Sequence, residues 1–181
     1  MERNEALALI KKHIKNKNMV KHCIAVEGEM IALARHFGED EKLWGLTGLL
    51  HDIDYEETDA DPELHAEVGA QMLEKEGLPS ELVHAVRAHN EKAPIESRMD
   101  RALFAADPLS GLIVAAALMH PEKKLSAMDA GFVLRRFKEK SFAAGANREQ
   151  IMTCSELGLE LEKFVEICLQ GMVDKSDELG L

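Results

Sequence analysis

The chain has 181 residues, of which 46% are hydrophobic and 30% charged, a balance typical of one soluble globular domain and not of a disordered segment. Its formal net charge of −11 argues against general nucleic-acid binding, which depends on cationic side chains. Aromatic residues make up only 4%, while Leu, Ala, Met, Glu and Lys are plentiful. Because unbranched side chains keep more freedom on a helix, we expect an all-α fold.

Three cysteines show neither CxxC spacing nor an even count, and we interpret them as reduced, buried thiols: Cys23, Cys154 and Cys168. The first residues lack the continuous apolar core of a signal peptide. No segment has the apolar length of a membrane span, and the best candidate, residues 112–120, is predicted to belong to a core helix. We expect a cytoplasmic protein without a membrane partner.

Caps and helix stops divide the first half of the chain into five predicted helices. The first begins at Asn4 and reaches the KNKN segment, and the second spans about 18–37 and ends at Gly38. Asp40 opens the third, whose leucines recur at helical spacing until His51. An acidic loop at 54–61 follows, then a helix from Pro62 to Glu76 and another from Ser80 to about Asn90.

The second half predicts one long helix followed by shorter ones. The long helix covers about 98–119, with a start or kink at Pro108 as the alternative. The shorter helices are expected at 126–139, 147–157 and 159–173, with the small-residue loop SFAAGAN between the first two and frayed polar residues at the C-terminus. Without a repeat or a shift in composition, this pattern predicts a single helical bundle.

Four ligand-type side chains share helix faces with apolar residues. These are His22 with Val26, His65 with Val68 and Met72, His89 with Leu82 and Val86, and Asp107 between Leu103 and Val114. The pattern directs polar groups towards the core, where a carboxylate is costly unless it is paired, hydrogen-bonded or metal-bound. Two interpretations remain at this point: a metal site, or a coincidence of hydrogen-bonded core residues.

Several segments together resemble the HD superfamily of metal-dependent phosphohydrolases: KHCIAVEGEMIALA, GLLHDIDYE, LHAEVGAQML, VRAHNE and FAADPLSGL. The resemblance implies an HD-type helical bundle with metal ligands His22, His51, Asp52 and Asp107. In a dinuclear branch of the superfamily, Asp52 would bridge two ions, with His65 and His89 completing the second site. The implied cofactor is one or two divalent transition-metal ions, and Mn, Fe, Co, Ni and Zn all suit such ligands to different degrees.

The superfamily motifs span about residues 18–118, and a C-terminal helical extension covers about 121–175. We treat 1–181 as one domain, although the extension resembles only a group of uncharacterised predicted HD hydrolases. The LHAEVGA and AHN settings are similar to those of bacterial enzymes that split diadenosine tetraphosphate symmetrically. Asp54 and Tyr55 replace the Gly-Lys of the HD-x-G-K variant, and the HHE and GYP signatures of cyclic-di-GMP phosphodiesterases are absent, which argues against a cyclic-dinucleotide substrate.

The resemblance implies an enzyme that uses a metal-activated water to cleave a phosphate ester or anhydride of a nucleotide or another small phosphorylated metabolite. Asp54 or Glu56 is a candidate for orienting the water or protonating the leaving group, with a hydrated acidic loop as the alternative. Candidates for holding further phosphate charge, against the alternative of a solvated helix face, are Lys123, Lys124, Lys138, Lys140 and Arg148.

Two other classes of function remain open at the level of sequence. The same ligands loaded with a di-iron pair would support oxygenase chemistry, as in a few relatives of the superfamily. A non-catalytic nucleotide-sensing module is the second alternative, and the complete ligand set argues against it because degenerate sensors often lose a ligand. The sequence leaves the substrate, the metal and the oligomeric state open.

Overall fold

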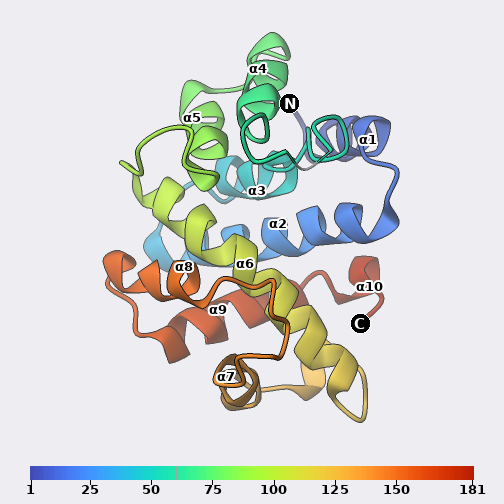
Figure 1. Cartoon of the computed structure of the whole chain (residues 1–181), viewed down its shortest axis with the longest axis vertical. Helices are drawn as coiled ribbons and strands as arrows, with labels where there is room; N and C mark the ends of the chain where they lie inside the picture. Colours follow the sequence, from blue (N-terminus) through green and yellow to red (C-terminus); the bar gives the residue numbers. More distant parts are fainter. Residues whose placement is uncertain (60) are drawn as a thin grey trace.

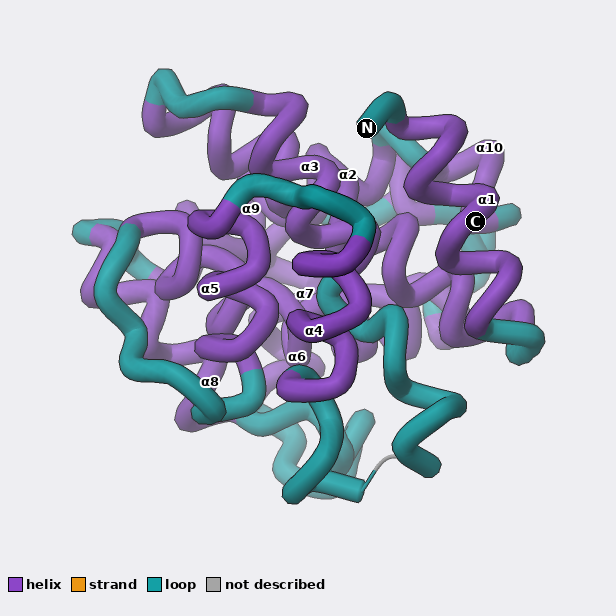
Figure 2. The backbone as a smooth tube through the Cα atoms, turned by 90° about the horizontal axis from the view of Figure 1, so that it is seen from above, coloured by secondary structure: helices purple, strands orange, loops and turns teal. Residues whose placement is uncertain are grey.

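A computed structural model describes residues 1–59 and 61–181. In this part of the chain every regular element is a helix, as Figure 2 shows, so the all-α prediction is confirmed. The elements are α1 (Arg3–His13), α2 (Lys17–Phe37), α3 (Glu41–Leu50), α4 (Glu67–Lys75), α5 (Ser80–His89), α6 (Arg98–Met119), the short 3-10 helix η1 (Leu125–Ala127), α7 (Ala130–Phe137), α8 (Arg148–Met152), η2 (Thr153–Leu157), α9 (Leu161–Val173) and α10 (Ser176–Leu179). The predicted acidic loop includes Ala60, which lies outside the described residues.

α2 is the central helix of the bundle (Figure 1). α3 packs along one side of it, α9 packs along another, and α6 crosses it. α5 contacts both α3 and α6, and α4 packs on α5. This arrangement brings the ends of several helices to one region beside the N-terminal half of α2 and the middle of α6.

Local capping signals place several helix ends where the sequence predicts them. The Asn16 side chain accepts from the N–H of Asn18 at the start of α2, and Gly38 ends that helix with a φ of 71°. Asp40 caps α3 by accepting from two backbone N–H groups. α1 departs from the prediction, since it begins after Glu2 instead of Asn4 and ends at His13, before the KNKN segment.

α4 begins at Glu67, later than the predicted start at Pro62. The preceding residues form turns, and Ala66 has a φ of 71°, which a helix does not allow. The Asp54 carboxylate accepts from the N–H groups of Ala66 and Gly69 at 2.9 and 2.8 Å. The start of α4 is therefore set by a carboxylate from a distant turn, and the local Asp-Pro signal is overridden.

α6 has the predicted bounds and continues through Pro108 without a break. Proline has no N–H to donate to the carbonyl four residues earlier, which here belongs to Phe104. The Gln150 side chain, in α8, donates to that carbonyl oxygen at 2.8 Å. A side chain from another helix thus replaces the missing backbone bond, and the alternative of a helix start at Pro108 is wrong.

α6 is long and apolar enough to cross a membrane by length and composition alone, with a mean hydropathy of 1.8 over its most apolar window. Of that window, 56% is buried within the bundle. The helix contacts α2, α5, α7, α8 and α9, which is the pattern of a core helix.

The C-terminal helices are shorter than predicted. The helix expected at 126–139 is reduced to α7 preceded by η1, and that at 147–157 is divided into α8 and η2. The last residues form α10 and are not frayed: Leu179 is buried, and its carbonyl accepts from the Lys21 ammonium at 2.5 Å. α9 carries this extension onto the centre of the fold by packing on α2.

Glu29 of α2 is fully buried, and neither of its carboxyl oxygens has a hydrogen-bond partner among the described residues. Burial therefore raises the pKa of Glu29 well above its ordinary value of 4.5. A raised pKa means that the folded protein retains a proton that the unfolded chain releases above about pH 4.5. The stabilising effect of that proton is present below the unfolded pKa and is lost as the pH rises.

We expect Glu29→Met to raise the free energy of unfolding by about 1–3 kcal/mol near pH 8, because it removes an unpaired buried carboxyl. The difference in unfolding free energy between Glu29→Met and wild type should become smaller towards about pH 5, because both proteins then bury a neutral side chain at this position. Urea denaturation of both proteins at the two pH values measures the difference. Parallel pH profiles for the two proteins would contradict a buried, proton-retaining Glu29.

Candidate metal centre

The fold brings the six predicted ligands together from different elements. His22 lies in α2, Asp107 lies in α6, and the others lie at or near the ends of α3, α4 and α5: His51, Asp52, His65 and His89. Gly48 makes the approach of α3 to α2 possible, because a Cβ at Gly48 would lie 2.7 Å from the Val26 carbonyl oxygen. The two residues that follow α3 are therefore held against α2.

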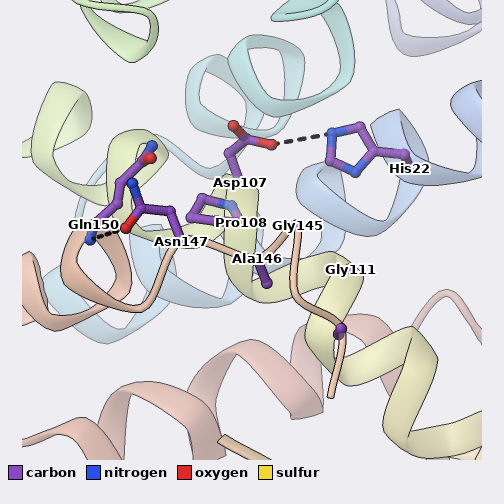
Figure 3. A pocket seen from close by; sticks show the side chains of 9 residues that line it. His22, Asp107, Pro108, Gly111, Gly145, Ala146, Asn147 and Gln150 are labelled. Atoms are coloured by element: carbon purple, nitrogen blue, oxygen red, sulfur yellow. Dashed lines mark hydrogen bonds and ion pairs between the residues drawn. The ribbon is translucent and has the colours of Figure 1, made fainter. Parts of the chain in front are cut away.

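The first group of donor atoms comes from α2, α3 and α6. His22 Nε2 lies 3.2 Å from His51 Nε2 and 3.1 Å from Asp107 Oδ1, and His51 Nε2 lies 3.5 Å from the same oxygen. Figure 3 shows the Asp107 carboxylate directed at the His22 ring. Three donor atoms thus converge on one point, as the ligands of a single cation do.

Asp52 joins this group to a second one. Its Oδ2 lies 3.2 Å from His22 Nε2, while its Oδ1 lies 3.2 Å from His65 Nε2 and 3.4 Å from His89 Nε2. The Nε2 atoms of His65 and His89 are 3.3 Å apart. One carboxylate therefore faces both pairs of imidazoles, which is the arrangement expected of a bridging ligand.

Hydrogen bonds on the outer side of each ring orient the imidazoles. Every Nδ1 has an acceptor: Ser110 Oγ for His22, the Gly48 carbonyl for His51, Asp54 Oδ1 for His65 and the Val86 carbonyl for His89. Ser110 donates its own hydroxyl proton to the Asp107 carbonyl, so its oxygen accepts from His22. Each neutral ring then carries its proton on Nδ1 and directs the Nε2 lone pair inward.

This donor set fits a metal. Inward lone pairs and two carboxylates are all acceptors, so protons or cations must lie between them. Burial is the largest influence on the pKa of His22, His51 and His65 and lowers it. Hydrogen bonds and charge from carboxylates outweigh burial and raise the three pKa values to about 10, 9 and 10: Asp52 acts on all three rings, Asp107 on the first two and Asp54 on the third. Divalent metal would displace these protons, so its affinity should increase with pH.

Comparison with known proteins identifies the family. The chain matches the HD domain family over residues 19–117, more than half of its 181 residues. It belongs to the HD domain family. This HD domain contains all six residues of the cluster, from His22 to Asp107.

Relatives of this HD protein include three that are named Ribonuclease Y. The one from Oleidesulfovibrio alaskensis is 37% identical over 97 residues, which are 53% of this chain and 18% of the relative. Those from Desulfotalea psychrophila and Aquifex aeolicus are both 32% identical, over 138 residues (74% of this chain, 26% of the relative) and 95 residues (52% and 17%). The chain thus spans about a quarter or less of their length, and no solved structure matches it significantly. Family and relatives support a metal-dependent HD hydrolase in general.

Two neighbouring cavities contain both His22 and Asp107 in their lining, and a third, of about 440 Å³, reaches His22 from the side of Lys21 and Ser110. The metal cavity, about 380 Å³, is lined by ligands of both groups together with Tyr55, Asn90 and Gln150. The loop cavity, about 460 Å³, shares His22, Asp107 and Gln150 with it and is otherwise lined by Pro108, Gly111 and residues 143 and 145–147 of the SFAAGAN loop. The space beside the candidate ligands therefore continues towards that loop.

Asp54 and Glu56 form their hydrogen bonds outside the metal cavity. Asp54 is fully buried, and its oxygens accept from His65 Nδ1 and from the start of α4, so it positions a ligand and faces away from the metal cavity. Glu56 is exposed and accepts from the backbone N–H groups of Lys15 and Asn16. Neither lines a cavity of the site, and the prediction that one of them handles the water or the leaving group finds no support in this geometry.

The cationic candidates also lie elsewhere. Among the described residues that line the two cavities, none is one of the five predicted phosphate-binding cations, which are Lys123, Lys124, Lys138, Lys140 and Arg148. The four lysines are exposed. The Arg148 guanidinium instead donates to carbonyl oxygens of the SFAAGAN loop, among them those of Ala143 and Ala146. Arg148 thus organises one wall of the loop cavity.

Tyr55 and Gln150 are two residues of the site that were not predicted from the sequence. Tyr55 lines the metal cavity, and its ring packs edge-on against His65 with centroids 5.8 Å apart. Tyr55 occupies the position of the lysine in the HD-x-G-K variant, and this correspondence could have marked it as a residue of the site. Gln150 lies far along the chain in a region without a motif, so only its contact with Phe104 reveals its place.

Proposed function

We propose that the protein hydrolyses a phosphate ester or anhydride of a small metabolite at a site for two divalent metal ions. The observation that carries the proposal is the Asp52 carboxylate, which faces two pairs of imidazole nitrogens at 3.2 to 3.4 Å. A divalent cation held there would supply Lewis-acid chemistry, since it lowers the pKa of water and offsets the charge that builds on phosphoryl oxygens.

The protein's own residues orient the imidazole rings and transfer the proton. Ser110, Gly48, Asp54 and Val86 hold the ligand rings in place, so little reorganisation is needed during reaction. Water forms a new bond to phosphorus while the bond to the leaving oxygen breaks. Tyr55 carries an ionisable O–H in the metal cavity, and we assign it to give the leaving oxygen its proton and to regain one from the attacking water.

The test is a phosphate-release screen on protein reconstituted with Mn, Fe, Co, Ni or Zn, combined with elemental analysis. About two equivalents of metal and turnover of at least one phosphorylated metabolite are expected. Less than about half an equivalent of every metal would overturn the metal site. Oxygen uptake by the iron form without phosphate release would instead favour the di-iron oxygenase.

A second candidate is RNA phosphodiester cleavage, because the matched relatives are named Ribonuclease Y. Attack of water on phosphorus is common to both candidates. The net charge of −11 and the absence of Lys and Arg from the lining of the metal cavity and the loop cavity favour a small substrate, since RNA binding depends on neutralising many phosphates. A short oligoribonucleotide in the screen separates the two candidates.

Tyr55→Phe tests the proton donor. We expect kcat for an alkyl phosphate to fall about tenfold to a hundredfold, because an alkoxide leaves poorly without a proton. For p-nitrophenyl phosphate, whose leaving group is stable as an anion, the loss should be only a few-fold. Steady-state kinetics with metal content measured in parallel gives both numbers. Equal losses on the two substrates would rule out proton donation by Tyr55.

A further inference from the structure

The loop cavity has a wall that lies outside the part of the chain that matches the HD family, which ends at residue 117. Arg148 holds this wall by donating to the carbonyls of Ala143 and Ala146 at 2.6 and 2.7 Å. The cavity nevertheless reaches His22 and Asp107. A segment particular to the C-terminal third of this chain is therefore in position to contact a substrate bound at the ligands.

The polar groups on this wall are amides. Figure 3 shows Asn147 and Gln150 together, on the side of Asp107 away from His22. Asn147 uses its carbonyl oxygen to accept from the N–H of Gln150, which leaves its amide N–H groups as donors. Gln150 donates to Phe104, which leaves its carbonyl oxygen as an acceptor. The wall thus offers neutral groups of both kinds.

Charge limits what can bind at the site. Two divalent ions bring four positive charges, and the carboxylates of Asp52 and Asp107 remove two, since the histidines are neutral as ligands. The Asp54 charge is met by backbone N–H groups at the start of α4. The remaining two positive charges match one phosphate monoester, which carries about −1.5 to −2 at neutral pH. Neither the metal cavity nor the loop cavity is lined by Lys or Arg, and the Lys21 ammonium beside His22 already donates to the Leu179 carbonyl, so further phosphates would remain largely unneutralised.

We propose that the substrate is a monophosphate ester whose neutral, hydrogen-bonding body, of the kind that a nucleoside provides, lies in the loop cavity against Asn147 and Gln150. This inference rests on the proposed function and extends it by naming the class of substrate and the residues that select it.

The first test measures kcat/KM of the metal-loaded protein on the mono-, di- and triphosphates of one nucleoside, on p-nitrophenyl phosphate and on a short oligoribonucleotide. We expect the nucleoside monophosphate to be preferred over the triphosphate and the oligoribonucleotide by at least about tenfold. A triphosphate or RNA hydrolysed as well as the monophosphate would overturn this inference and leave the proposed function intact. Failure of every substrate would count against the proposed function itself.

The second test changes the charge of the wall. Gln150→Lys keeps a donor for the Phe104 carbonyl but adds a cation, so the preference for monophosphate over triphosphate should fall by about tenfold. Gln170→Lys, on the exposed side of α9, is the matched control and should leave the preference unchanged. A non-hydrolysable phosphonate analogue of the monophosphate gives a readout independent of turnover: calorimetry should show weaker binding to Gln150→Leu than to wild type, by about fivefold to tenfold. Unchanged preference and unchanged affinity would remove Gln150 from substrate selection.

Discussion

Asp52→Asn is expected to abolish activity and metal binding together. Its two carboxylate oxygens lie 3.2 to 3.4 Å from the Nε2 atoms of all four histidines of the cluster. An amide has nearly the same shape but lacks the charge, and only one of its two terminal atoms can accept, so one group of imidazoles would face an N–H donor. We expect kcat/KM to fall by at least about a thousandfold and the bound metal to fall below half an equivalent. Elemental analysis and a phosphate-release assay measure the two effects.

The matched control for this variant is Asp177→Asn, since Asp177 is exposed on α10. It should retain full metal content and activity. If Asp52→Asn kept normal metal content, Asp52 would not be a shared ligand. If it kept normal turnover, the centre would not be the place of reaction.

Asp54→Asn tests how much the orientation of His65, as distinct from direct metal ligation, contributes to the site. Asp54 accepts from His65 Nδ1 and from the N–H groups of Ala66 and Gly69 at 2.8 to 2.9 Å, and an asparagine would turn an N–H towards at least one of these donors. We expect the free energy of unfolding to fall by about 2–3 kcal/mol and metal affinity to fall about tenfold to a hundredfold, because His65 loses its orientation. Urea denaturation and competition with a chelator measure these quantities.

Asp129→Asn provides a comparison at an ordinary helix cap. Asp129 accepts from the N–H of Phe132 at the start of α7, and asparagine is an equally good capping residue, so stability should change by less than about 0.5 kcal/mol. Should Asp54→Asn behave like Asp129→Asn in both stability and metal affinity, Asp54 would be an ordinary cap without a role at the metal centre.

Much of the fold could be predicted from local pattern. Gly38, Asp40 and the 98–119 segment act through their immediate neighbours, by left-handed backbone, by capping and by helical periodicity. The residues of the cluster could also be named in advance: helix spacing places His22 and Asp107 on apolar faces, and the resemblance to the HD superfamily implies the set that includes His51 and Asp52. The helix features depend on a few consecutive residues and can be read from a single sequence, whereas the ligand set came from the resemblance.

The sequence by itself therefore determined an all-helical chain with a set of candidate metal ligands directed at its core. Only the tertiary structure decided what the polar side chains around that set do. Asp54 reaches the start of α4, Gln150 reaches the carbonyl left open by Pro108, and Arg148 turns to its own loop. The physical reason is that a hydrogen bond forms with whichever buried donor or acceptor lacks a partner, and folding alone brings these groups together.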